Sequence, residues 1–237
     1  MIRLAAVSDL HFKSSEIGSV KTRLFGVNDT ADLLLLPGDL IDSGTADDAR
    51  LLVRELEDIT LPILAVVGNH EFSAGMIGQV LDIYRQSGIR LLDGDAADFI
   101  IRRESIGVVG TRGCRGGFGE SALQPTYEPE VSYWLDVAEA EVLKIESGLG
   151  SIITDYRVVM THFSPVRGTL EGEVPEEIPF YGSGMLCEPV DRLGADVIIH
   201  GHSHKGQQRG TSPGGIPVYN VAATVIPAPY IIVELGS

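Results

Sequence analysis

Three of the six histidines in this chain of 237 residues fall within the seven-residue segment "HGHSHKG", His200 to Gly206. The other three, His11, His70 and His162, each follow a different apolar run. Neutral imidazole is the most common side-chain ligand of metals in proteins. The cluster therefore indicates a metal site, whereas a histidine such as His162, considered alone, could equally be a buried and hydrogen-bonded residue.

Carboxylates and an amide accompany the histidines at the ends of the same apolar runs. Asp9 and His11 end the first run, Asp39 the second, and Asn69 and His70 the third. Each of these short motifs alone is typical of a turn. Together, carboxylates, an amide oxygen and neutral imidazoles form a ligand set that suits manganese, iron or zinc.

The elements that must position these residues follow from the apolar patterning. Helical periodicity with apolar residues at i, i+3, i+4 and i+7 predicts helices within 45–59, 73–88 and 130–146, and Thr45 with Asp48 predicts an N-terminal cap. Short apolar runs, many rich in β-branched residues, predict buried strands at 2–9, 32–39, 61–70, 99–103, 106–112, 156–163, 195–202, 216–223 and 230–235.

This alternation predicts an α/β fold built in layers, with a hairpin-like segment at 100–109. The candidate ligands all follow the carboxyl ends of predicted strands, which is the edge where open α/β sheets build their sites. No linker divides the chain, so we expect one domain over residues 1–237.

Charge and composition exclude several classes of function. The formal net charge is −15, which disfavours an extended nucleic-acid partner and an anionic membrane surface. No apolar run approaches the roughly 20 residues of a membrane span, and the N-terminal residues do not resemble a signal peptide. Cys114 and Cys187 form no paired motif, which favours reduced thiols and a cytoplasmic location. The oligomeric state stays open.

The ordered motifs resemble the calcineurin-like metallophosphoesterase superfamily. The resemblance runs from residue 9 to residue 204, and its five blocks, in order, are Asp9-x-His11, Gly38-Asp39, Gly68-Asn69-His70-Glu71, His162, and Gly201-His202-x-His204. It implies a four-layer αββα sandwich, in which two mixed β-sheets pack face to face with helices outside. It also implies a site for two metal ions at the sheet edge.

The resemblance assigns a role to each matching residue. One metal ion would be held by Asp9, His11 and His204, the second by Asn69, His162 and His202, and Asp39 would bridge them. A hydroxide between the two ions would be the nucleophile that attacks phosphorus. His70 would stabilise the transition state or protonate the leaving oxygen. His200 has no role in the pattern, and we interpret it as a packed histidine that supports the site.

The chain departs from the protein phosphatases of this superfamily, which have arginine where Ser43 and Val67 stand here, so the match of Glu71 to that group is misleading. We therefore expect a hydrolase of small soluble phosphoesters, with a phosphodiesterase acting on a substrate such as a cyclic nucleotide favoured. The alternatives are a phosphomonoesterase, a nuclease of the same superfamily, and a non-catalytic scaffold. The scaffold is disfavoured because His70 is present.

Two long loops, 111–129 and 163–185, lie next to predicted strand ends. Loops of this length in a compact domain are commonly functional. We expect them to form the wall of the substrate site and to contribute little to folding. Arg112 and Arg115 in the first loop are candidate phosphate-binding residues, and the competing interpretation is a mobile surface loop.

Overall fold

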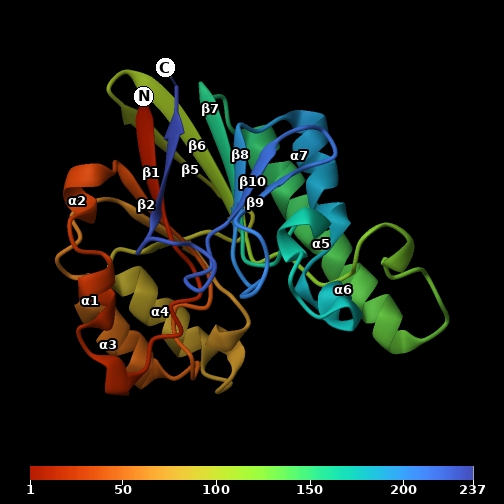
Figure 1. Ribbon diagram of the computed structural model, residues 1–237, viewed down its shortest axis with the longest axis horizontal. Helices are drawn as coiled ribbons and strands as arrows, with labels where there is room; N and C mark the ends of the chain where they lie inside the picture. The colour runs from red at the N-terminus through yellow and green to blue at the C-terminus, as the bar shows by residue number, and fades with distance from the viewer. Residues whose placement is uncertain (237) are drawn as a thin grey trace.

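The computed structural model describes residues 1–236 and contains two β-sheets that pack against each other with helices on the outer faces (Figure 1). The first sheet has five strands in the order β11-β1-β2-β3-β4, and the second has six in the order β5-β6-β7-β8-β10-β9. The strands are β1 (Ile2–Ala6), β2 (Leu33–Pro37), β3 (Ile63–Val66), β4 (Arg90–Leu91), β5 (Ala96–Ile101), β6 (Glu104–Thr111), β7 (Tyr156–Thr161), β8 (Val197–His200), β9 (Arg209–Thr211), β10 (Pro217–Asn220) and β11 (Ile231–Leu235).

Both sheets are mixed. Strands β1 to β4 are parallel, and β11 joins β1 in the antiparallel direction. In the second sheet β6, β7, β8 and β10 are parallel, while β5 and β9 are antiparallel to their neighbours. The expected architecture of two mixed sheets flanked by helices is confirmed.

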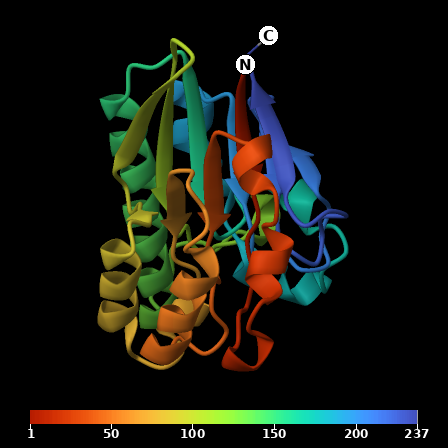
Figure 2. The ribbon, with the colours of Figure 1, turned by 90° about the vertical axis from the view of Figure 1, so that its left-hand side faces the viewer.

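The helices form the two outer layers. In Figure 1, α1 to α4 lie on the left, beside the first sheet, and α5 and α7 on the right, beside the second. Figure 2 shows α2 in front of the strands of the first sheet, with α1 below it. The helices are α1 (Ser19–Arg23), α2 (Val27–Thr30), α3 (Ala46–Leu56), α4 (Ile77–Gln86), α5 (Pro129–Ser151), α6 (Ile178–Tyr181) and α7 (Cys187–Leu193). No helix within residues 1–236 combines the length and apolar character that a membrane crossing requires.

The continuous apolar runs of the strands are explained by burial on both faces. In β7, Val158 and Met160 pack between the two sheets, whereas Val159 faces the helical layer that contains Ile145 and Leu149 of α5. Since each face of the strand is covered, strict apolar–polar alternation is not needed. The strands could therefore be predicted from continuous apolar runs, because they lack a two-residue alternation of apolar and polar residues.

The predicted helices are found, with shifted ends. Thr45 accepts a hydrogen bond from Asp48 N at 3.3 Å, which confirms the cap of α3. Helix α5 extends five residues beyond the predicted 146 and begins at Pro129, a residue that fits the first turn of a helix. The hairpin of β5 and β6 turns at Arg102 and Arg103, whose φ values of 51° and 77° are those of a type I′ turn.

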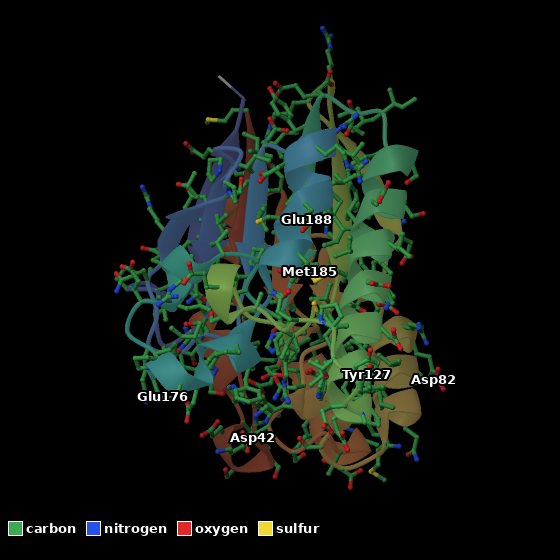
Figure 3. All side chains as sticks on the ribbon, turned by 90° about the vertical axis from the view of Figure 1, so that its right-hand side faces the viewer. Asp42, Asp82, Tyr127, Glu176, Met185 and Glu188 are labelled. Atoms are coloured by element: carbon green, nitrogen blue, oxygen red, sulfur yellow. The ribbon has the colours of Figure 1, made fainter. Side chains whose placement is uncertain are left out.

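Parallel strands carry their carboxyl ends to one edge of the molecule. In Figure 1 the N-terminus lies at the top and β1 runs downward, so this edge lies in the middle of the view, above α1, α3 and α4. Figure 3 shows Asp42, which follows β2 in the chain, at the lower end of the molecule, well below Glu188 of α7. Every candidate ligand follows a strand that ends at this edge, so the fold brings residues distant in sequence together.

Candidate metal centre

The first group of candidate ligands comes from the segments after β1 and β8. His204 Nε2 lies 3.0 Å from Asp9 Oδ1, and His11 Nε2 lies 3.3 Å from His204 Nε2 and 3.9 Å from Asp9 Oδ1. Three donor atoms therefore converge on one point. Their number and spacing suit a single cation.

The second group comes from the segments after β2, β3, β7 and β8. His162 Nε2 lies 3.2 Å from Asn69 Oδ1 and 3.4 Å from Asp39 Oδ2. The ligand atoms of Asp39, His162 and His202 all lie within 4.8 Å of one another. His162 is fully buried, so this group lies deeper in the protein than the half-exposed His204.

Asp39 stands between the two groups. Its Oδ2 atom lies 3.4 Å from His162 Nε2 of the second group and 3.9 Å from His11 Nε2 of the first. A carboxylate placed in this way can supply a shared anion between two cations, which otherwise repel each other.

The electrostatics of the second group favour a cation. His162 Nδ1 hydrogen-bonds to Pro37 O at 2.9 Å, so in the neutral ring Nδ1 carries the proton and Nε2 presents a lone pair. That lone pair faces two oxygen atoms that are also acceptors, Asn69 Oδ1 and Asp39 Oδ2. Only a proton or a metal ion between these atoms relieves the repulsion.

The pKa values express the same preference. Burial lowers the pKa of His162, but the charge of Asp39 and its hydrogen bond raise it to about 9. Burial likewise raises the pKa of Asp39, and the charge of His162 outweighs that effect and holds it well below the usual range. In contrast, burial lowers the pKa of His11 and lowers that of His202 to about 3, so both imidazoles are neutral and available as ligands. Carboxylates, an amide oxygen and neutral imidazoles fit manganese, iron or zinc.

The backbone at this edge is strained. Asp9, His11, Asp39 and His202 have φ values of 55°, 43°, 50° and 69°. Non-glycine residues adopt this region at a cost of about 1–3 kcal/mol each, and such residues concentrate at functional sites. Four of the seven candidate ligands share this conformation, so the strain is concentrated where the ligand atoms gather.

Two motif glycines make room for the candidate ligands. A Cβ atom on Gly68 would lie 2.0 Å from Asp39 Oδ1, and one on Gly201 would lie 2.4 Å from Asp9 Oδ2. Any side chain at these positions would displace a carboxylate. This explains physically why Gly precedes Asn69 and His202 in the sequence.

Neighbouring groups fix the orientation of the two carboxylates. Asp9 Oδ2 accepts hydrogen bonds from Ser8 Oγ at 2.5 Å and His202 N at 2.9 Å, which leaves Oδ1 for the first group. Asp39 Oδ1 accepts from His70 N at 2.8 Å, which leaves Oδ2 for both groups. The sequence did not indicate a role for Ser8.

Glu71 is fully buried beneath the site. Its carboxylate accepts backbone hydrogen bonds from Gly68 at 2.7 Å and Leu40 at 2.7 Å, with longer ones from Asp39 and Ile41. It therefore ties the segment after β2 to the segment after β3. Glu71 matches the protein phosphatases in sequence, but the sequence alone did not indicate this structural role.

His70 lies beside the two groups, and Asp42 holds it. His70 Nδ1 hydrogen-bonds to Asp42 O at 2.9 Å, and its ring meets the ring of His11 edge-on at a centroid distance of 4.4 Å. The Asp42 carboxylate also lies 3.3 Å from His11 Nδ1 and 3.6 Å from His70 Nδ1. Asp42 was not among the predicted residues, although it follows Asp39 by only three positions.

His200 is packed, as interpreted from the sequence. It is fully buried, its Nδ1 hydrogen-bonds to Gly201 O at 2.8 Å, and its Nε2 lies 2.9 Å from Thr169 Oγ1. These contacts join the end of β8 to the loop after β7. His200 is thus the one histidine of the cluster that lies outside both ligand groups.

The two long loops are both more buried than expected. In the second loop residues 163–166, 169 and 170 are buried, and the segment contains α6, so the expectation that it contributes little to folding is wrong. Gly113 N and Thr111 Oγ1 both donate to the buried Glu141 of α5, and residues 113, 114 and 116 to 118 are buried. The expectation that the loop 111–129 contributes little to folding is therefore wrong for its first half, because Glu141 pins it against α5. Residues 125 to 130 are exposed, and Figure 3 shows Tyr127 in front of the lower part of α5.

The two arginines of the first loop have different surroundings. The guanidinium of Arg112 lies 5.0 Å from the ring centre of Phe72, which closes the short turn that begins at His70. The guanidinium of Arg115 lies 5.2 Å from Trp134 and 5.9 Å from Phe180. Arg112 is thus next to the site, whereas Arg115 links the start of α5 to α6.

Comparison with known proteins agrees with the geometry. The family model of the calcineurin-like phosphoesterases matches residues 2–206. An uncharacterized metallophosphoesterase of Aquifex aeolicus is 31% identical over 103 residues, which are 41% of this chain and 38% of that protein. A probable cyclic nucleotide phosphodiesterase of Moraxella catarrhalis is 37% identical over 75 residues, 29% of this chain and 27% of that protein. The matched regions therefore span well under half the length of these two relatives.

Solved structures show the same fold. Phosphopantetheinyl hydrolase from Mycobacterium tuberculosis superimposes with a TM-score of 0.70 at 14% identity, covering 97% of this chain and 95% of that one. Purple acid phosphatase from yellow lupin seeds gives a TM-score of 0.57 at 12% identity, covering all of this chain and 46% of that one. At these identities the likeness concerns the fold alone. Because the family model spans most of the sequence, the chain belongs to the calcineurin-like phosphoesterases, a family of phosphoric ester hydrolases.

Proposed function

We propose that this chain is a phosphodiesterase that depends on two divalent cations and acts on a small soluble diester such as a cyclic nucleotide. The observation that carries the proposal is the position of Asp39, whose Oδ2 faces the imidazoles of both ligand groups at 3.4 and 3.9 Å. A single metal site would not require a carboxylate shared in this way.

In this proposal each group would hold one cation, manganese, iron or zinc, and Asp39 would serve as a ligand common to both. The residues of the first group are Asp9, His11 and His204, and those of the second are Asn69, His162 and His202. When bound, such cations neutralise the phosphoryl oxygens and lower the pKa of the attacking water.

His70 has the geometry of a general acid. Its bond to Asp42 O keeps a proton on Nδ1, so Nε2 is the nitrogen that gains and loses the second proton. The carboxylate of Asp42 lies 3.6 Å from the same Nδ1 atom. We infer that His70 Nε2 donates a proton to the leaving oxygen of the substrate.

The preference for diesters follows from the charges around the site. A monoester dianion is best bound by several cationic side chains in addition to the metals. Ser43 and Val67 stand where the related phosphatases have arginine, and Arg112 next to the site supplies a single positive charge. Lys13 Nζ lies 3.5 Å from the Asp42 carboxylate, and this negative charge offsets the positive charge of Lys13. A diester carries one negative charge and leaves as a poor alkoxide, for which proton donation by His70 matters more.

The choice of a nucleotide diester rests on a relative. The Moraxella catarrhalis protein named as a probable cyclic nucleotide phosphodiesterase is 37% identical over a region of 75 residues. The buried free thiols of Cys114 and Cys187 support the proposed cytoplasmic location, because such thiols persist in a reducing compartment. The net charge of −15 supports a small substrate over a nucleic acid.

Hydrolysis of matched aryl esters tests this function. Metal-free protein is loaded with manganese, iron or zinc, and kcat/KM is measured for bis(4-nitrophenyl) phosphate and for 4-nitrophenyl phosphate, followed by a series of cyclic nucleotides. We expect the diester to have the higher kcat/KM. A higher value for the monoester would refute the diester preference, and no turnover of any ester with any metal would refute the hydrolase.

A further inference from the structure

A cavity of about 660 Å³ opens between α1 and the segment 223–229 that precedes β11. Leu10 lines it from one side, and Ala223 and Ile226 line it from the other. Its volume lies in the range of pockets that bind small organic molecules. None of its lining residues belongs to the two ligand groups.

The cavity is connected to the candidate metal centre through neighbouring backbone. Leu10 stands between Asp9 and His11 in the chain, and Ala223 N donates to Ser8 O at 3.0 Å. The next residue, Thr224, donates from Oγ1 to His204 O at 2.8 Å. The cavity therefore adjoins the first ligand group, on the side of His11 and His204.

The lining has an apolar base and a polar rim. Val20 and Ile226 are 3% and 6% exposed and, with Leu10, form the apolar part. Ser19 and Thr22 contribute hydroxyl groups. This combination suits a flat organic group with hydrogen-bonding edges more than a simple hydrocarbon chain.

The rim carries no net charge. Glu16 and Arg23 both line the cavity, and Arg23 is already engaged by a hydrogen bond from Nη1 to Pro229 O at 3.0 Å. A second phosphate on the substrate would find no excess of positive charge here. The occupant that fits is uncharged.

We propose that this cavity binds the nucleoside part of a phosphodiester substrate while the phosphoryl group lies at the metal centre. This inference rests on the proposed phosphodiesterase function, and it specifies which substituent on phosphorus the protein recognises. The base would lie against Leu10 and Ile226, and the sugar hydroxyls would be near Ser19 and Thr22.

Two diesters with the same leaving group test the cavity. Methyl 4-nitrophenyl phosphate and thymidine 5′-(4-nitrophenyl) phosphate differ only in the group that stays on phosphorus, so the ratio of their kcat/KM values isolates binding of the nucleoside. We expect the wild-type kcat/KM for the thymidine ester to exceed that for the methyl ester by about tenfold or more, because additional contacts to a substrate group commonly change kcat/KM by this factor.

The variant Ala228→Trp fills the cavity from its exposed rim. We expect its ratio to fall to near one. Because the ratio compares two substrates on one preparation, a partial loss of folded protein cancels. Ala140→Trp, at an exposed position on α5, is the matched control and should keep the wild-type ratio. A wild-type ratio near one, or an unchanged ratio in Ala228→Trp, would overturn the inference.

Failure of the proposed function can be recognised separately. If the wild-type protein hydrolyses neither ester, the phosphodiesterase proposal fails, and the cavity is then tested by calorimetric titration with thymidine itself. Binding to the wild-type protein and to Ala140→Trp, with loss in Ala228→Trp, would support the cavity as a nucleoside site. Absence of binding to the wild-type protein, or equal binding to all three, would overturn it.

Discussion

Replacing His70 with alanine removes the proposed general acid while leaving the ligand groups intact. The hydrogen bond that orients Asp39 comes from the backbone N–H of residue 70, at 2.8 Å, and alanine retains it. The His70 side chain is 34% exposed and contacts Asp42 and the His11 ring at the surface of the site, so its loss opens no internal cavity. We therefore expect metal content to be kept and the melting temperature to change little.

The loss of rate should depend on the leaving group. Removal of a general acid typically costs about 10²–10⁴-fold, and this should apply to a diester with an alkyl or nucleoside leaving group. A 4-nitrophenolate needs no proton to depart, so the loss for a nitrophenyl diester should be much smaller. The assay is kcat/KM for both substrates in wild type and His70→Ala, with metal content measured on the same samples.

Equal losses on the two substrates would refute the assignment of His70 as an acid. They would mean that the side chain acts on the phosphoryl oxygens or through His11. Loss of metal would likewise contradict the structural argument that backbone N–H alone orients Asp39.

Four further substitutions separate binding, stability and positioning. Arg112→Ala should raise KM about tenfold with little change in melting temperature. Arg115→Ala should instead lower the free energy of unfolding by about 1 kcal/mol, because its aromatic contacts are lost, and should leave KM unchanged. The same KM in both variants would contradict this distinction. Burial raises the pKa of Asp32, but its pair with Arg102 outweighs this and holds the pKa below 3.8. The destabilisation by Asp32→Asn, about 1 kcal/mol near pH 7, should therefore shrink as the pH falls below 3.8, and a difference independent of pH in chemical denaturation would refute it. Glu71→Gln places an amide against backbone donors and should cost about 1–3 kcal/mol and weaken metal binding; wild-type metal affinity by titration would show that Glu71 does not position the ligands.

Much of the fold was readable because the strands are short, apolar and separated by glycine or polar residues. The nine predicted strands are present, and the only two missed, β4 (Arg90–Leu91) and β9 (Arg209–Thr211), are edge strands of two and three residues with little burial. Helix α7 was missed because seven residues with Pro189 among them are too few to show a period.

The candidate ligands were predictable because they stand directly after strands whose direction is fixed by the sheet. The contacts around them depend on local backbone conformation, which residue types do not reveal. Asp42 contacts His11 and His70 after the chain turns at Asp39, whose φ is 50°. Glu71 binds backbone N–H groups, which every residue type except proline has, so a sequence motif cannot indicate this contact.

In the proposed site, Asp39 would bridge two metal ions. Metal analysis of the purified wild-type protein should give up to two transition-metal ions per chain, and exhaustive chelation should abolish diester hydrolysis until metal is restored. Asp39→Asn should lose both metal occupancy and rate, because the amide cannot supply the shared negative charge. Full hydrolysis by protein shown to be free of metal would contradict the account.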